Sequence, residues 1–148
     1  MLSLKQTGDQ AFVFLVYAST RLDELALVDW SLEQKEAFLR MQFDLRDRQY
    51  RQAFPGSVTE MILSDDQPAG MLMTHETESC LYLVDLALLP EFRGAGLGTQ
   101  ILQNLQKKMK PITLHVLRQN PAVHLYSRLG FITTTEDAIY QQMEWKPL

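Results

Sequence analysis

The hydrophobic pattern of the first third of the chain predicts two helices. Asp9 is placed to cap the N-terminus of a helix that runs to about Arg21. This helix is apolar on almost every side, so we expect neighbours to cover it on several sides. Ser31 and Gln34 have the spacing of a capping box and begin a second helix that ends near Tyr50. Its apolar stripe has the helical i, i+3, i+7 spacing at Phe38, Met41 and Leu45.

After the helix-breaking segment 54–57, "FPGS", the pattern becomes that of strands. Residues 58–64, 68–75 and 80–89 read as three successive strands joined by the turns "DDQP" and "ETES". The third is the longest and most apolar, which is typical of a central strand buried on both faces. Residues 2–6 predict a short edge strand before the first helix.

In the last third of the chain, segments with helical spacing of apolar residues alternate with segments typical of strands. One face of a helix is predicted by Leu97, Ile101, Leu102, Leu105 and Met109, and residues 111–117 read as the next strand. Asn120 is placed to cap a short helix, with Pro121 at its first position and Gly130 just past its end. Residues 131–145 close the chain as a hairpin. The order β-α-α-β-β-β-α-β-α-β-β predicts an α/β (α+β) fold with a mixed sheet, in one domain of residues 1–148.

Composition narrows the functional classes. The 148 residues carry a net charge of −4, which disfavours nucleic acid as a partner because nucleic-acid binding normally needs a basic surface. Cys80 is the single cysteine and has no partner for an internal disulfide. The N-terminal residues lack a signal-peptide pattern and no apolar run could span a membrane, so we expect a cytoplasmic protein. His75 and His124 read as surface residues, and no histidine has companions at metal-ligand spacing, so no metal site is predicted.

Three glycines, Gly94, Gly96 and Gly98, lie between a long strand and the first turn of a helix. Amides at a helix start are unsatisfied donors at the positive end of the helix dipole, and glycine lets a phosphate approach them. Arg93 adds a permanent positive charge, so the turn predicts a pyrophosphate site. The spacing is one residue short of a dinucleotide-binding loop, and Thr99 follows Gly98 without the lysine of a triphosphate loop. A glycine-rich turn without a ligand stays open as an alternative.

Two linked motifs carry a resemblance to a known family. Arg93, Gly96 and Gly98 are followed some two dozen residues later by "NPAVHLYSRLGF" (residues 120–131). Together they resemble the GNAT superfamily of N-acetyltransferases, and the close resemblance covers roughly residues 81–131. Ala122 departs from the family pattern, since it stands one place before the commonest spacing.

The resemblance implies a fold and a cosubstrate. It implies a mostly antiparallel, twisted sheet with a splayed central strand pair and about four flanking helices, and acetyl-CoA in the gap between the splayed strands. The pyrophosphate would rest on the glycine turn and the pantetheine arm would pair with the end of the central strand. The residues implied to bind acetyl-CoA are Leu86, Ala87, Leu88, Arg93, Gly94, Ala95, Gly96, Leu97, Gly98, Thr99, Asn120 and Tyr126.

Acetyl transfer to an amine needs a base for the ammonium and an acid for the departing thiolate. Tyr126 matches the tyrosine of the family motif, which implies that it is the acid; core packing of this residue is compatible with that role. His115 is a candidate base, because it alternates with apolar residues on a strand that lines the implied gap. Asp85 lies within the most apolar strand and is either paired or a second candidate base. A water relay without a single base remains an alternative.

The acceptor is open at this stage. Tyr17, Arg21, Asp23 and Glu24 cluster at the polar end of the first helix, where they either form a solvated helix end or bind the substrate. We expect an amine-bearing small molecule or peptide as partner, and a monomer or homodimer. An acyl-CoA-binding sensor of the same fold, without turnover, is the alternative to an enzyme.

Overall fold

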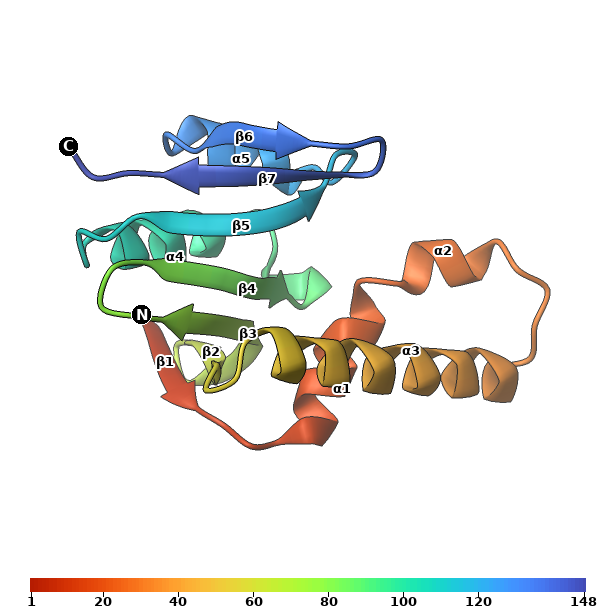
Figure 1. Ribbon diagram of the computed structural model, residues 1–148. Coiled ribbons are helices and arrows are strands. Elements are labelled where there is room, and N and C mark those ends of the chain that lie inside the picture. The colour runs from red at the N-terminus through yellow and green to blue at the C-terminus, as the bar shows by residue number, and fades with distance from the viewer.

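A seven-stranded mixed sheet carries helices on both faces in the computed structural model, which describes residues 1–148 (Figure 1). Neighbouring strands follow the order β1-β2-β3-β4-β5-β7-β6, and every pair is antiparallel except β4 and β5. The strands are β1 (Leu2–Gln6), β2 (Val58–Ser64), β3 (Gln67–Glu76), β4 (Leu81–Leu88), β5 (Ile112–Leu117), β6 (Ile132–Glu136) and β7 (Tyr140–Trp145). The predicted fold class is confirmed.

The helices form two layers, one on each face of the sheet (Figure 1). Helices α1 and α3 cover one face, and α4 and α5 cover the other. The bounds are α1 (Gln10–Ser19), α2 (Leu22–Ala26), α3 (Leu32–Ala53), α4 (Leu97–Gln106) and α5 (Ala122–Arg128), with a 3₁₀ turn η1 (Pro90–Phe92). None of them is both long and apolar enough to cross a bilayer.

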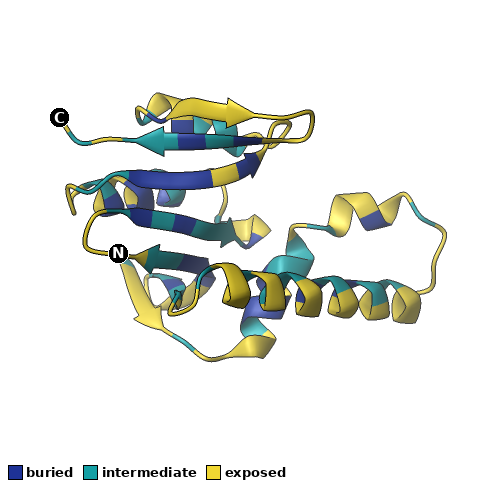
Figure 2. Ribbon diagram, viewed as in Figure 1, coloured by how far each residue is buried: buried dark blue, intermediate teal, exposed yellow.

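Each face of the sheet has its own apolar core. The α4–α5 face buries alternate residues of β4 and β5, such as Leu81, Leu83 and Leu114, against Ile101 and Leu102 of α4. The α1–α3 face buries a smaller cluster that includes Val16, Phe43 and Met71. Figure 2 shows that the middle strands are largely buried, whereas strand β6 and the outer side of α3 are exposed.

Most predicted elements occur where the sequence placed them, with five main differences. In α3 the buried residues are Leu39 and Phe43, whereas Met41 and Leu45 of the predicted stripe are exposed, so the helix packs through a neighbouring face. Strand β3, with 10 residues, is longer than β4, with 8, and the second half of β4 is only half-buried because it borders an open gap. Leu15 is 56% exposed, so α1 has a free side. Met109 lies beyond the end of α4 with φ of 58°. The short helix α2 was not predicted, since five residues are too few to show a period.

The capping box at the start of α3 is present in full. Ser31 Oγ accepts a hydrogen bond from the Gln34 amide at 3.1 Å, and the Ser31 amide donates to Gln34 Oε1 at 2.9 Å. Because Ser31→Ala leaves one of these amides without a partner, we expect a loss of about 1 kcal/mol in unfolding free energy, measured by urea denaturation. Ser127→Ala removes an exposed hydroxyl from α5 and should change stability by less than about 0.5 kcal/mol.

Candidate active site

The site is built around the point where β4 and β5 separate. The two strands pair over only three residues, Leu81 to Leu83 against Ile112 to Leu114. On the other edge of β4, the Leu89 amide still donates to the Ala69 carbonyl of the β3 side at 2.8 Å. Since hydrogen bonding alternates along an antiparallel ladder, Leu86 and Leu88 direct their backbone groups away from β3 and into the gap. The gap therefore presents a free strand edge to a ligand.

The glycine turn after β4 forms an open cradle of amides. Gly94 and Gly96 have φ of 80° and 81°, a conformation that disfavours side chains, and a Cβ on either would meet no atom within 4 Å. Helix α4 begins directly after Gly96, and no side chain caps its first amides. This arrangement fits a phosphate group.

Gly98 is required for a different reason. A Cβ at Gly98 would lie 3.2 Å from Leu125 Cδ2, so the missing side chain lets α4 and α5 pack closely. Arg93 is exposed, and its Nε donates to the Leu88 carbonyl at 3.0 Å. That bond fixes the guanidinium between the end of β4 and the glycine turn.

A cleft of about 620 Å³ extends from this turn along the end of β4. Its lining contains seven of the residues implied to bind acetyl-CoA, namely Leu86, Ala87, Leu88, Arg93, Gly98, Asn120 and Tyr126. Asn120 Oδ1 accepts from the Ala122 amide at 2.9 Å and so caps α5, which begins at Ala122, one residue after the predicted start. Gly94 to Leu97 and Thr99 do not line the cleft. We refer to it as the turn-side cleft.

A second cleft of about 620 Å³ opens on the α1–α3 face, and we refer to it as the helix-side cleft. The two clefts share Leu86, Leu117, Asn120 and Tyr126, so they meet in the gap between β4 and β5. Two ligands that enter from opposite faces of the sheet would therefore meet at these four residues.

Tyr126 stands at the junction of the two clefts. It is 7% exposed and packs against Phe131, with ring centroids 5.6 Å apart. Burial raises the pKa of its phenol to about 12, so the hydroxyl keeps its proton at neutral pH. A group that stays protonated at this position can donate a proton.

His115 lies in the helix-side cleft as an exposed residue of β5. Its ring stacks on that of Tyr82, with centroids 6.4 Å apart and planes 13° apart. His115 is the one histidine in the lining of this cleft. His75, interpreted as a surface residue from the sequence, is half-buried, and its Nδ1 has no hydrogen-bond partner.

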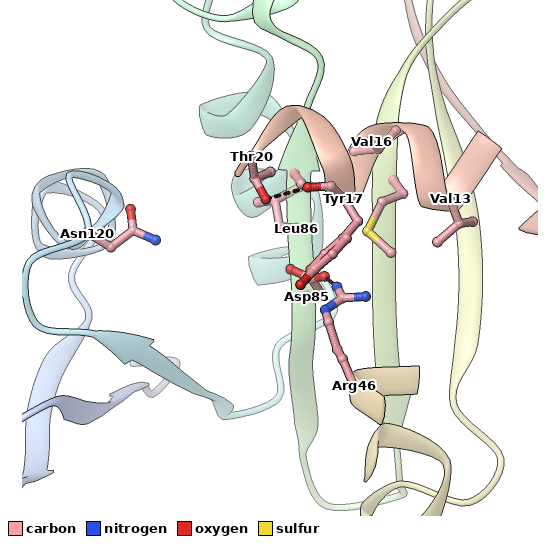
Figure 3. A pocket seen from close by; sticks show the side chains of 10 residues that line it. Val13, Val16, Tyr17, Thr20, Arg46, Asp85, Leu86 and Asn120 are labelled. Carbon is pink, nitrogen blue, oxygen red and sulfur yellow. Dashed lines mark hydrogen bonds and ion pairs between the residues drawn. The ribbon is translucent and has the colours of Figure 1, made fainter. Parts of the chain in front are cut away.

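Asp85 forms an ion pair with Arg46 of α3 (Figure 3). The sequence indicated that Asp85 is paired or functional but did not identify its partner. Arg46 also lies between two aromatic rings, 5.0 Å from the centroid of Tyr17 and 4.7 Å from that of Tyr50. Because the guanidinium of Arg46 is paired with the carboxylate of Asp85, Asp85 is poorly placed to accept a proton.

A β-bulge places Asp85 on this face of the sheet. Thr74 pairs with Leu83 and Met73 pairs with Asp85, so Val84 is an extra residue in β4. With strict alternation Asp85 would share the α4–α5 face with Leu83; the bulge instead directs both Val84 and Asp85 toward α3.

The polar end of α1 is only partly directed at the clefts. Tyr17 and Arg21 line the helix-side cleft, where Arg21 Nη1 donates to Tyr17 Oη at 2.7 Å. Asp23 lines the turn-side cleft. Glu24 lines neither cleft and accepts from Arg21 Nε at 2.9 Å.

The model of the acetyltransferase (GNAT) family matches residues 20–131, which is more than half of the chain. The chain belongs to the GNAT family. GNAT proteins are acetyltransferases, a class of acyltransferases, so the predicted family is confirmed. A sequence search of curated proteins found no significant match.

Solved structures with the same fold cover essentially the whole GNAT chain. PaiA N-acetyltransferase from Thermoplasma acidophilum in complex with coenzyme A has a TM-score of 0.71 and 20% identity, covering 100% of this chain and 99% of its own. An acetyltransferase from Thermus thermophilus has a TM-score of 0.68 and 19% identity, covering 100% and 97%. The Campylobacter jejuni N-acetyltransferase PseH in complex with acetyl coenzyme A has a TM-score of 0.62 and 17% identity, covering 99% of both chains.

Proposed function

We propose that the protein transfers an acetyl group from acetyl-CoA to a primary amine of a small molecule or peptide, by direct attack in a ternary complex. The observation that carries this proposal is the meeting of two clefts at Tyr126 and the free edge of β4. One cleft ends at a cradle suited to phosphate, and the other is open to an acceptor.

The turn-side cleft and the glycine turn at its end together have the groups that acetyl-CoA requires. The amides at the start of α4 and the charge of Arg93 suit the pyrophosphate. The free backbone groups of Leu86 and the amide of Leu88 suit the amide-bearing pantetheine arm, while the Leu88 carbonyl is held by Arg93. When bound, acetyl-CoA supplies an activated acetyl group, and an amide at the end of β4 would polarise its carbonyl. Two of the structural neighbours described above were crystallised with coenzyme A or acetyl coenzyme A, which supports acetyl-CoA as the cosubstrate.

The proton transfers fall to residues on either side of the junction. An ordinary alkylamine has a pKa of about 10.4, so roughly one molecule in 10³ is neutral at pH 7. His115, directly or through water, would accept the proton from the acceptor, since Asp85 is engaged by Arg46. Tyr126 would donate its proton to the departing sulfur. Cys80 lines neither cleft, which supports direct attack over a cysteine-bound intermediate.

Two measurements test this function together. Calorimetry should detect binding of acetyl-CoA, and a thiol-reactive dye should detect CoA release only when an acceptor amine is added. Binding without release, across a broad amine library, would instead indicate an acyl-CoA sensor. Absence of binding would contradict both interpretations.

The phosphate cradle has a matched pair of test variants. Gly96→Ala and Gly56→Ala both place a side chain at positive φ, 81° and 86°, where a Cβ meets no other atom. Both should lose about 1 kcal/mol of stability. Only Gly96→Ala adds a methyl group to the turn whose amides are assigned to the pyrophosphate, so it alone should weaken acetyl-CoA binding, by about tenfold in Kd. Equal affinities for the two variants would contradict the assignment of the cradle.

A further inference from the structure

The helix-side cleft contains every tyrosine of the protein. Nineteen residues line it, and all five tyrosines are among them: Tyr17, Tyr50, Tyr82, Tyr126 and Tyr140. Phe54 adds a sixth aromatic ring. Such a concentration of aromatic rings is not typical of a pocket for a purely polar ligand, so the lining indicates which class of acceptor it binds.

Two of these rings and the imidazole of His115 form a continuous wall. The centroids of Phe54 and Tyr82 are 5.0 Å apart, and the rings of Tyr82 and His115 are stacked with centroids 6.4 Å apart. Tyr17 and Tyr50 are less available, because the guanidinium of Arg46 lies against both. The wall from Phe54 to His115 therefore offers the surface against which a flat ring can pack.

The charges in the cleft disfavour a second cation on the acceptor. The charged side chains in its lining are Arg21, Arg46 and Asp85, two cations and one anion. The anion is already paired with Arg46. Glu24, which pairs with Arg21, lies outside the lining and is 62% exposed. A polycation would find no free carboxylate here, and the surplus positive charge favours the neutral form of a bound amine.

From these two features we infer that the acceptors are aromatic primary amines without a second positive charge, with or without a carboxylate. This inference rests on the proposed function and specifies its substrate class. The ring packs on the wall of Phe54, Tyr82 and His115, and the amine extends toward Tyr126 at the junction of the clefts. The amine nitrogen forms a bond to the acetyl carbon, the carbon–sulfur bond breaks, and the amine proton leaves as CoA departs as its thiol.

The test is a comparison of kcat/KM across a defined panel. Phenethylamine, tyramine and phenylalanine represent the inferred class; hexylamine lacks the ring, and spermidine and kanamycin carry several charges. The kcat/KM for the best aromatic amine should exceed the kcat/KM for spermidine and for kanamycin by at least about tenfold. A preference for spermidine or kanamycin would overturn the inference and leave the proposed function intact. Binding of acetyl-CoA without acetylation of any amine would refute the proposed function, and this inference with it.

Two variants locate the effect on the wall. Phe54→Leu and Tyr82→Leu should each raise KM for the best aromatic amine by about fivefold to tenfold, and change KM for hexylamine by less than twofold. Acetyl-CoA affinity should be unchanged in both, which separates a lost ring contact from general damage to the fold. Trp30→Leu is the control, because Trp30 contacts Phe38 and lines neither cleft. Equal losses for aromatic amines and hexylamine would overturn the inference.

Discussion

Replacement of Tyr126 by phenylalanine is expected to lower kcat by about 10²- to 10³-fold, in the range of a lost general acid. The side chain keeps its ring, so its packing against Phe131 remains. What disappears is a hydroxyl at the junction of the two clefts that keeps its proton, because burial raises its pKa to about 12. Steady-state kinetics with a thiol-reactive dye measures the loss.

The binding step provides the control for Tyr126→Phe. Acetyl-CoA affinity and thermal stability should stay close to those of the parent protein, since the substitution removes one oxygen and no apolar contact. Ser127→Ala, which removes the neighbouring exposed hydroxyl, should leave kcat within about twofold. If Tyr126→Phe retains full turnover, the phenol is a packing residue and another group or water protonates the sulfur.

Gly70→Ala is expected to destabilise the protein by about 3 kcal/mol, the upper part of the usual range for overpacking. A Cβ at Gly70 would lie 2.2 Å from the Ala87 carbonyl oxygen and 3.0 Å from Leu88 Cα. Both are backbone atoms of the β4 end, so no side-chain rotation relieves the clash. The strands must separate where β4 borders the gap, and urea denaturation measures the cost.

The same variant connects the fold to the site. Ala87 and Leu88 form part of the turn-side cleft. Displacement of the end of β4 by the added methyl group should therefore also weaken acetyl-CoA binding in the protein that remains folded. Gly8→Ala is the matched substitution, since a Cβ at Gly8 meets nothing within 4 Å and its backbone is not at positive φ. It should change stability by less than about 0.5 kcal/mol. A Gly70→Ala protein as stable as Gly8→Ala would show that the strands have room to relax.

The features that the sequence predicts well are those set by neighbouring residues. The capping box of Ser31 and Gln34 depends on residues three apart, and the bounds of β2 follow from a short run between two turn segments. The glycine turn is local too, and the resemblance carried by Arg93, Gly96 and Gly98 led to the family. The roles assigned to Tyr126, His115 and the acetyl-CoA-binding residues stay predictions.

What the sequence does not show depends on contacts between distant segments. Arg46 is one of several charged residues along α3, and nothing near it in the chain indicates a partner in β4. The bulge at Val84 changes the face of Asp85 without any sign in the alternation of β4. Gly70 looks like an ordinary strand glycine until β3 and β4 are placed side by side. The five tyrosines are spread from residue 17 to residue 140, and their shared cleft exists only in the folded chain.

The three-residue ladder between β4 and β5 divides the sheet into two panels, β1–β4 and β5–β7 (Figure 1). Backbone pairing across this seam is shorter than any pairing within either panel, so the panels rely on α4 and α5 for much of their mutual alignment. A molecule lodged in the seam touches both panels and holds them at one angle. Binding of such a molecule therefore also restricts the relative motion of the two panels. We expect the protein with this molecule bound to be the stiffer and more stable form.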